Sequence, residues 1–166
     1  SGLIGLLAVG AFMIVWYRLP GLVAVAALLL YIVLLLGIFK MVPVTLTIAG
    51  IAGVILSMGM AVDANILIFE RMKEELIRGR SLEEAIGQGF SRAWTSIRDS
   101  NVSSLITCGI LYWFGTSMVQ GFALTLGIGI GVSMFSAIII TRTLLFALMI
   151  RRLSAKRTLF LSGIAR

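Results

Sequence analysis

The sequence has no histidine and only one cysteine, and each shortage excludes a class of chemistry. Without histidine, the 166-residue chain has no imidazole that could bind a metal ion or shuttle protons near neutral pH. Cys108 cannot form an intrachain disulfide, and its place in an apolar run is typical of a buried, inert thiol. The chain also contains no Walker A motif and no Ser/His/Asp set. We therefore expect no enzyme and no bound cofactor or metal.

Charged residues are also scarce, at 13% of the chain, whereas an ordinary globular domain has about a quarter. Hydrophobic residues make up 60%, and the mean hydropathy is +1.10. A soluble protein of this length could not bury so much apolar surface, but a bilayer accepts it directly. The net charge of +7 comes from basic residues beside apolar runs, which favours anionic lipid headgroups over nucleic acid as partners. The predicted fold class is all-α, a polytopic transmembrane helix bundle.

Five apolar runs approach or exceed the roughly 20 residues that a helix needs to cross a bilayer. They predict a transmembrane domain over residues 1–150, with spans at residues 2–17, 22–39, 44–69, 99–119 and 121–142. Ser81 and Glu84 are spaced as in a capping box, and apolar residues at helical spacing follow them. We therefore predict an amphipathic helix over residues 82–98, followed by the fourth span. Residues 151–166 are predicted to form a basic tail.

Lys and Arg are distributed unequally between the two sides of this predicted bundle. Of the 14 basic residues, 13 lie on the side of Arg18, together with the amphipathic helix and the tail, while Lys40 lies alone on the other. Cytoplasmic loops are enriched in Lys and Arg, so the amphipathic helix and the C-terminus are predicted to be cytoplasmic. The chain starts almost within a span, and we expect it to be part of a longer protein joined on the outer side.

Asp63 is the only acidic residue well inside a predicted span. Placing such a charge in the membrane costs about 2.5–3.5 kcal/mol on insertion scales. At ~1.5 Å per residue it lies about 9 Å from the middle of the span, too deep for its short side chain to reach the headgroups. A carboxylate that carries a proton or ion is the favoured interpretation, because intramembrane carboxylates are usually tied to transport. The alternative is a structural Asp that hydrogen-bonds to neighbouring helices.

Two further polar positions and a set of small residues accompany Asp63. Asn65 points to a different face of the helix and is interpreted as a hydrogen-bonding contact between helices. Arg142 lies near the cytoplasmic end of the fifth span and is interpreted as a snorkelling anchor. Small residues allow helix backbones to approach closely, either for static packing or for sliding. The candidate packing positions are Gly53, Gly59, Gly127 and Gly131.

The stretch GMAVDANILIFERMKEE at residues 59–75 resembles the fourth-span signature of the SecD/SecF family, within the resistance-nodulation-division superfamily. The likeness covers about residues 2–148 and includes Thr141-Arg142. The order Asp63-Ala64-Asn65 resembles the SecD side of the family, whose partner SecF has an Asn-Asp-Thr pattern there. This resemblance implies the second to sixth spans of a SecD-like protein. The family's first span and its large extracytoplasmic domain would lie upstream.

The resemblance implies a role in Sec-dependent protein export, driven by the proton motive force, in a bacterial or archaeal inner membrane. The implied partners are SecF, the SecY/SecE/SecG channel and other membrane insertion factors. Exported unfolded protein would be contacted mainly by the extracytoplasmic domain. Asp63 matches the family's intramembrane aspartate, which is proposed to take part in proton conduction. The same motif includes Asn65, Glu70, Arg71 and Arg142, without an assigned role.

Two alternative functions stay open from the sequence. The first is one half of a proton-coupled exporter of small molecules or lipids from the same superfamily. The second is a passive scaffold for assembling the translocon. The first would show substrate-stimulated efflux, and the second would tolerate loss of Asp63 while failing when the packing glycines are enlarged.

Overall fold

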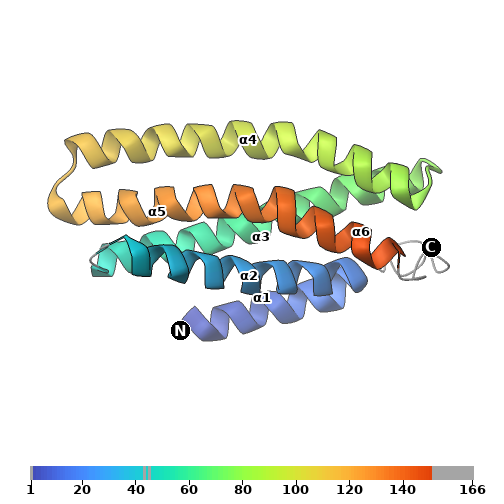
Figure 1. Ribbon diagram of the computed structural model, residues 1–166, viewed down its shortest axis with the longest axis horizontal. Helices are drawn as coiled ribbons and strands as arrows, with labels where there is room; N and C mark the ends of the chain where they lie inside the picture. The colour runs from blue at the N-terminus through green and yellow to red at the C-terminus, as the bar shows by residue number, and fades with distance from the viewer. Residues whose placement is uncertain (1, 43, 45, 151–166) are drawn as a thin grey trace.

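The computed structural model describes residues 2–42, 44 and 46–150, and within these ranges it contains helices and no strands. The tail predicted at residues 151–166 lies outside the described residues. Figure 1 shows the helices running side by side along one axis, with α4 at the top and α1 against α2 at the bottom. The predicted all-α bundle is therefore confirmed. In chain order its elements are α1 (Gly2–Tyr17), α2 (Leu19–Met41), α3 (Ile48–Ile77), α4 (Leu82–Phe114), α5 (Ser117–Phe135), the π-helix η1 (Ser136–Thr141) and α6 (Arg142–Ile150).

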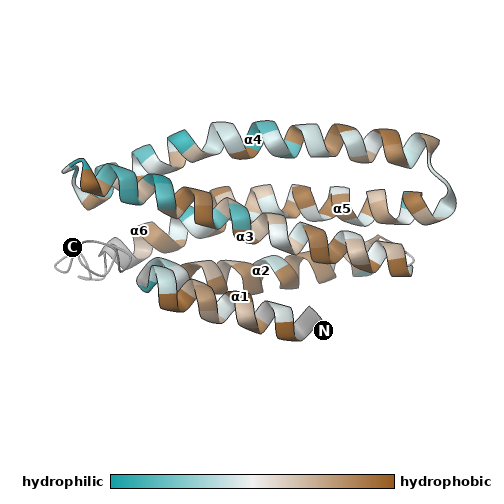
Figure 2. Cartoon of the chain, turned by 180° about the vertical axis from the view of Figure 1, so that it is seen from behind, coloured by the Kyte–Doolittle hydropathy of each residue, from teal (hydrophilic) through white to brown (hydrophobic). Residues whose placement is uncertain are grey.

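Most of the surface of this bundle is apolar. Three helical stretches of the described chain are long and apolar enough to cross a membrane, namely Pro20–Met41, Ile48–Ile77 and Ser117–Ala147. The shorter apolar segment Leu7–Tyr17 precedes them. Figure 2 shows that hydrophilic residues gather toward one end of the bundle, over the end of α3 and the first half of α4. Lipid is the solvent that such a surface requires, so the chain is a multi-pass membrane protein.

α4 is a single helix of 33 residues. It joins the predicted amphipathic helix and the predicted fourth span into one continuous element, and it ends at Phe114, before the expected boundary at residue 119. The hydroxyls of Ser103, Ser104 and Thr107 each donate to the carbonyl oxygen four residues earlier, at 2.9–3.1 Å. These polar side chains are therefore satisfied within the helix and do not interrupt it.

The connections between the first three helices also differ from the simplest interpretation of the sequence. Arg18 alone separates α1 from α2, with a positive φ of 52°. α3 begins at Ile48, four residues after the predicted start of the third span, because Thr47 caps it. The Thr47 hydroxyl oxygen accepts a hydrogen bond from the Gly50 N–H at 3.0 Å. That bond satisfies one of the free donors of the first helical turn.

The interior is organised around α3, which packs mainly against α5 and α4. The Thr125 hydroxyl of α5 donates to the Gly50 carbonyl oxygen of α3 at 2.9 Å. A side chain at Gly53 would collide with the Thr125 hydroxyl and with the Phe122 carbonyl oxygen, 2.8 Å away. The lack of a side chain at Gly53 therefore lets the two backbones approach within hydrogen-bonding reach.

The other small residues differ in how closely a neighbouring helix approaches them. Gly129 of α5 lies directly against Ser57 of α3, whose hydroxyl is 2.8 Å from the Tyr31 hydroxyl of α2. A side chain at Gly127 would meet Cys108 at an ordinary 3.7 Å, whereas Gly59 and Gly131 have no neighbour within 4 Å among the described residues. A packing role for Gly59 and Gly131 thus stays a prediction that concerns contacts outside this part of the chain.

Replacing Gly53 by Ala should destabilise the bundle, because the added methyl group must push α3 and α5 apart. Overpacking of this kind costs about 1–3 kcal/mol. The measurement is thermal unfolding in detergent, with Gly59→Ala as the matched control on the same helix. In this chain on its own the control should be at least as stable as the parent, since no described residue lies within 4 Å of a side chain at Gly59 and Ala is the better helix former. Equal stability of the two variants would contradict this account of α3–α5 packing.

The start of α4 predicts a pH-dependent contribution to stability. The Ser81 N–H and hydroxyl donate to Glu84 Oε2 at 3.0 and 2.9 Å, and these bonds lower the pKa of Glu84 below its ordinary value. The carboxylate therefore stabilises the fold fully above the ordinary Glu pKa, and the contribution disappears as the pH falls through the lowered pKa. Glu84→Gln should be less stable than the parent at neutral pH and equally stable in acid. A stability difference that is constant with pH would exclude the capping box as its source.

Candidate functional site

Asp63 lies in the middle of α3, on the side that faces away from the other helices. It shares this exposed face with Ala52, Leu56 and Gly59, which lie at three- and four-residue spacing along the helix. No hydrogen bond or ion pair joins Asp63 to any other residue that the structure describes. The carboxylate thus lies on an apolar helix face, without a hydrogen-bond or ion-pair partner among the described residues.

Asn65 occupies the opposite, inner side of α3. Its side chain is 3% exposed, and its Oδ1 accepts a hydrogen bond from the Thr141 hydroxyl at 2.7 Å. Two residues along an α-helix correspond to roughly 200° of rotation, which explains why Asp63 points outward when Asn65 points inward. The structure therefore gives these two motif residues different surroundings. Asn65 is hydrogen-bonded inside the bundle, and Asp63 lies on the exposed face of α3.

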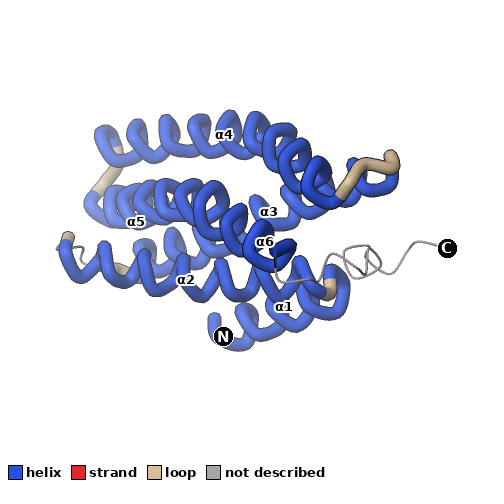
Figure 3. Tube along the Cα trace, turned by 45° about the vertical axis from the view of Figure 1, so that its right-hand side comes forward, coloured by secondary structure: helices blue, strands red, loops and turns tan. Residues whose placement is uncertain are grey.

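Thr141 is the last residue of the π-helix η1. At the other end of this element, the Ser136 hydroxyl donates to the Ala27 carbonyl oxygen of α2 at 3.4 Å. Side-chain hydrogen bonds thus connect η1 to α2 at its start and to α3 at its end. Figure 3 shows that α5 and α6 follow one helical path through this element. Single-turn π-helices are frequent at functional sites, so η1 belongs to the candidate site together with Asn65.

Glu70 and Arg71, the charged end of the motif, bind neither Asp63 nor Asn65. Glu70 accepts a hydrogen bond from the Tyr17 hydroxyl at 2.9 Å, which connects α3 to the end of α1. Arg71 forms an ion pair with Glu74 at 3.0 Å on the same helix. Both contacts anchor the end of α3.

Arg142 begins α6 and is exposed. Its guanidinium lies 5.9 Å from the centre of the Phe146 ring, within the range of a cation–π contact. It forms no ion pair with any described residue, and no hydrogen bond links it to Asp63. The position next to Thr141 nevertheless attaches Arg142 to the segment that Asn65 holds.

Glu75 is a polar centre that the sequence analysis missed. It is 1% exposed and lies 2.6 Å from Arg92 of α4, 2.8 Å from Arg80 and 2.9 Å from Arg78. These ion pairs connect the end of α3 to the start of α4. The helical spacing of the sequence could have predicted its burial, because Glu75 lies on the same face of α3 as the buried residues Ile68 and Met72. It supports the bundle through these ion pairs, whereas Asp63 forms none with any described residue.

Thr141→Val should weaken the fold, because it leaves the buried Asn65 amide without its partner. The expected loss is about 0.5–2 kcal/mol of unfolding free energy, the range for hydrogen bonds between membrane helices. Thermal unfolding in detergent measures it, and Thr143→Val is the matched control because Thr143 is exposed. A control as destabilised as Thr141→Val would show that the hydrogen bond is not the cause.

Comparisons with known proteins agree with this arrangement. Residues 2–151 match the family described as protein export membrane protein SecD/SecF, C-terminal. The protein translocase subunit SecD of Thermobaculum terrenum is 62% identical over 149 residues, which cover 87% of this chain and 29% of that protein. The SecD of Dehalococcoides mccartyi is 59% identical over 150 residues, which cover 87% of this chain and 33% of that protein. The chain thus spans about a third of these relatives.

The fold also has a match among solved structures. A crystal structure of SecDF from Thermus thermophilus, described as a translocon-associated membrane protein, superposes with a TM-score of 0.88 at 42% sequence identity. The match covers 92% of this chain and 21% of that one. A second structure of SecDF, in a form called super-membrane-facing, gives a TM-score of 0.87. The chain therefore belongs to the SecD/SecF family of protein export membrane proteins.

Proposed function

We propose that this chain is the membrane part of a SecD-type subunit that uses the proton motive force to support protein export. In this proposal it works beside the SecY channel together with SecF. The names of the relatives, protein translocase subunit and translocon-associated membrane protein, support the general role in export. The energy coupling is supported by one observation on this chain, the exposed carboxylate of Asp63 on α3, which has no hydrogen-bond or ion-pair partner in the described part of the chain.

The physical argument concerns the cost of leaving Asp63 in lipid. A carboxylate near the middle of a bilayer costs about 2.5–3.5 kcal/mol on insertion scales, so it is normally paired or faces a polar cavity. Its own chain offers no partner within the described residues. The exposed face of α3 must therefore meet a second polar surface. SecF is the partner that the family offers, so we place it along Ala52, Leu56, Gly59 and Asp63.

Coupling would follow from the protonation of Asp63. The neutral acid loses most of its cost in an apolar interface, whereas the ionised form favours a polar or wet one. The two forms thus prefer different contacts along α3. Asn65 lies two residues away and holds Thr141 of η1, so a shift of α3 would be passed to α6. Two such states, each favoured by one protonation form, are what a proton-driven rocking of two halves requires.

The charge distribution gives the proposed orientation. The connections α1–α2 and α3–α4 and the start of α6 lie at one end of the bundle, and the connections α2–α3 and α4–α5 lie at the other (Figure 1). Arg18, Arg78 and Arg80 belong to the first end, and Lys40 belongs to the second. Cytoplasmic surfaces are rich in Lys and Arg, so the end with α6 is proposed to face the cytoplasm.

Asp63→Asn tests this function in the full-length protein. The amide keeps the size of the side chain and mimics its neutral form, so it cannot alternate between two charge states. We expect loss of the component of protein export that depends on the proton motive force, measured in membrane vesicles with and without an ionophore. Asp63→Glu is the matched control, since it keeps a titratable group and should retain part of that component.

Two accompanying measurements separate the alternative functions. Asp63→Asn should still copurify with SecF and the SecY channel, because the substitution leaves the helix surface intact. Normal proton-dependent export by Asp63→Asn would favour the passive scaffold and refute the coupling. A defect in drug or lipid efflux together with normal export would favour the small-molecule exporter.

A further inference from the structure

A groove runs between the first half of α4 and the junction of η1 with α6, away from Asp63. Its volume is about 400 Å³. Aromatic and aliphatic side chains make up much of its wall, while one hydroxyl and one guanidinium provide its polar groups. No acidic side chain lines it among the described residues. The lining residues are Gly87, Phe90, Ser91, Trp94, Ile138 and Arg142.

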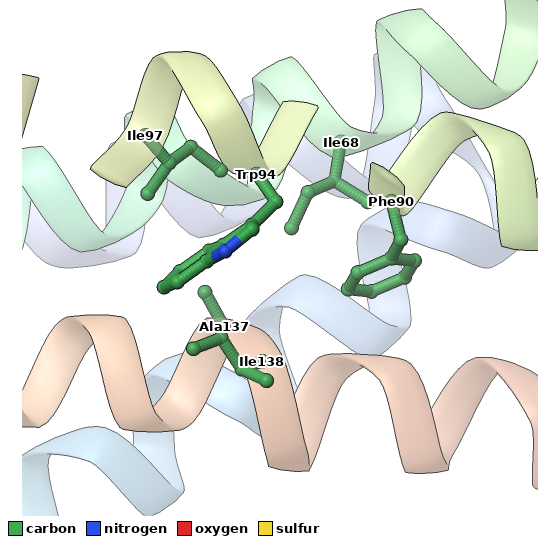
Figure 4. Close-up of a pocket in the computed structure, with 6 residues that line it drawn as sticks. All are labelled: Ile68, Phe90, Trp94, Ile97, Ala137 and Ile138. Atoms are coloured by element: carbon green, nitrogen blue, oxygen red, sulfur yellow. The ribbon is translucent and has the colours of Figure 1, made fainter. Parts of the chain in front are cut away.

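The inner end of this groove is purely apolar. Figure 4 shows Trp94 and Phe90 reaching from α4 toward Ala137 and Ile138 of η1, with Ile68 of α3 behind them. The small cavity there has room for little more than a water molecule and shares Phe90, Trp94 and Ile138 with the groove. The groove therefore adjoins an apolar cavity. Its two polar lining residues, Ser91 and Arg142, are both exposed.

Arg142 is the charged residue in the lining of this groove, and its positive charge favours an anionic ligand. It is exposed, and it has no ion-pair partner in the part of the chain that the structure describes. Its guanidinium carbon lies 5.9 Å from the centre of the Phe146 ring, and a cation–π contact occupies none of its N–H donors. A guanidinium beside a hydroxyl is suited to a phosphate, which accepts several charge-assisted hydrogen bonds. The polar lining residues of the groove, Ser91 and Arg142, are thus suited to bind an anion.

The position in the membrane identifies the source of that anion. Trp94 is an amphipathic aromatic residue of the kind that concentrates at bilayer interfaces, and the polar half of α4 that includes it lies at the basic end of the bundle. Basic sites between transmembrane helices at this depth bind phospholipid headgroups. The guanidinium and the hydroxyl in its lining favour the phosphate of a headgroup over the apolar side chains of a partner helix.

We infer that the groove between α4 and the η1–α6 junction binds one anionic phospholipid, with its phosphate at Arg142 and Ser91 and its acyl chain against Phe90, Trp94 and Ile138. Asp63 does not line the groove, and the inference does not depend on the proposed proton coupling. A bound lipid would fill the gap beside η1 and hold α6 against α4. Zwitterionic lipid would enter the same groove more weakly, since its net charge does not complement the Arg142 guanidinium.

The test uses the fluorescence of Trp94 in the full-length protein reconstituted with brominated lipids, which quench tryptophan on contact. The signal of Trp94 is isolated by subtracting the quenching of a Trp94→Phe variant. Brominated phosphatidylglycerol should quench half-maximally at about 5-fold lower mole fraction than brominated phosphatidylcholine, as one basic residue at the membrane surface predicts. Equal quenching by the two lipids would overturn the inference, and so would no quenching by either, which would mean that protein covers the groove.

Variants locate the effect. Arg142→Gln should abolish the preference for phosphatidylglycerol, and Arg142→Lys should retain it. Lys73→Gln is the matched control, since it removes the same charge at the same end of the bundle from a residue outside the groove. Loss of the preference in Lys73→Gln, or its survival in Arg142→Gln, would mean that general surface charge attracts the lipid and would refute the site.

A second variant tests occupancy without removing a charge. A side chain at Gly87 meets nothing within 4 Å, so Gly87→Leu should fill the groove without straining the backbone, and Leu is the better helix former. It should reduce quenching of Trp94 by both lipids. Unchanged quenching in Gly87→Leu would show that the lipid contacts Trp94 from outside the groove and would overturn the inference.

Discussion

α3 and α5 approach so closely that a hydroxyl of one helix reaches a backbone carbonyl of the other, and the remaining contacts depend on this. Inside a bilayer there is no water to satisfy a polar group, so each must find a partner within the protein. Gly53 and Gly129 make the approach possible, and Thr125 uses it to bond Gly50. The same closeness lets Ser57 contact Tyr31, which joins α2 to the pair.

This packing also explains why the carboxylate faces outward. The inner side of α3 is filled by Gly53, Ser57 and Asn65, whose neighbours on α5, α2 and η1 already complete their contacts. Nothing there would stabilise a charge. Asp63 therefore lies on the remaining face, where, in the proposed function, its energy would depend on the surface of a partner subunit. A titratable group placed at an interface favours different contacts in its two protonation states.

η1 connects α3, which carries Asp63, to the groove between α4 and the η1–α6 junction. Thr141 bonds Asn65, Ile138 of the same short element lines the groove, and Arg142 follows directly. A lipid phosphate at Arg142 and a movement of α3 at Asn65 would thus act on neighbouring positions of one segment. A π-helix suits such a place, because its hydrogen bonding is less regular than that of the α-helices on either side. The composition of the inner leaflet would then affect how firmly α6 follows α3.

The sequence by itself determined the class of protein and the most costly residue. Apolar runs near bilayer length identify membrane helices regardless of their neighbours, and an ionised carboxylate is costly in lipid on whichever helix face it lies. The quoted motif also predicted the family correctly. Only the tertiary structure decided that Asp63 faces outward and Asn65 inward, that Gly53 is a point of contact while Gly59 is open, and that Glu75 is buried. The physical reason is that a sequence shows which groups need a partner, whereas the partner depends on which helix lies against each face.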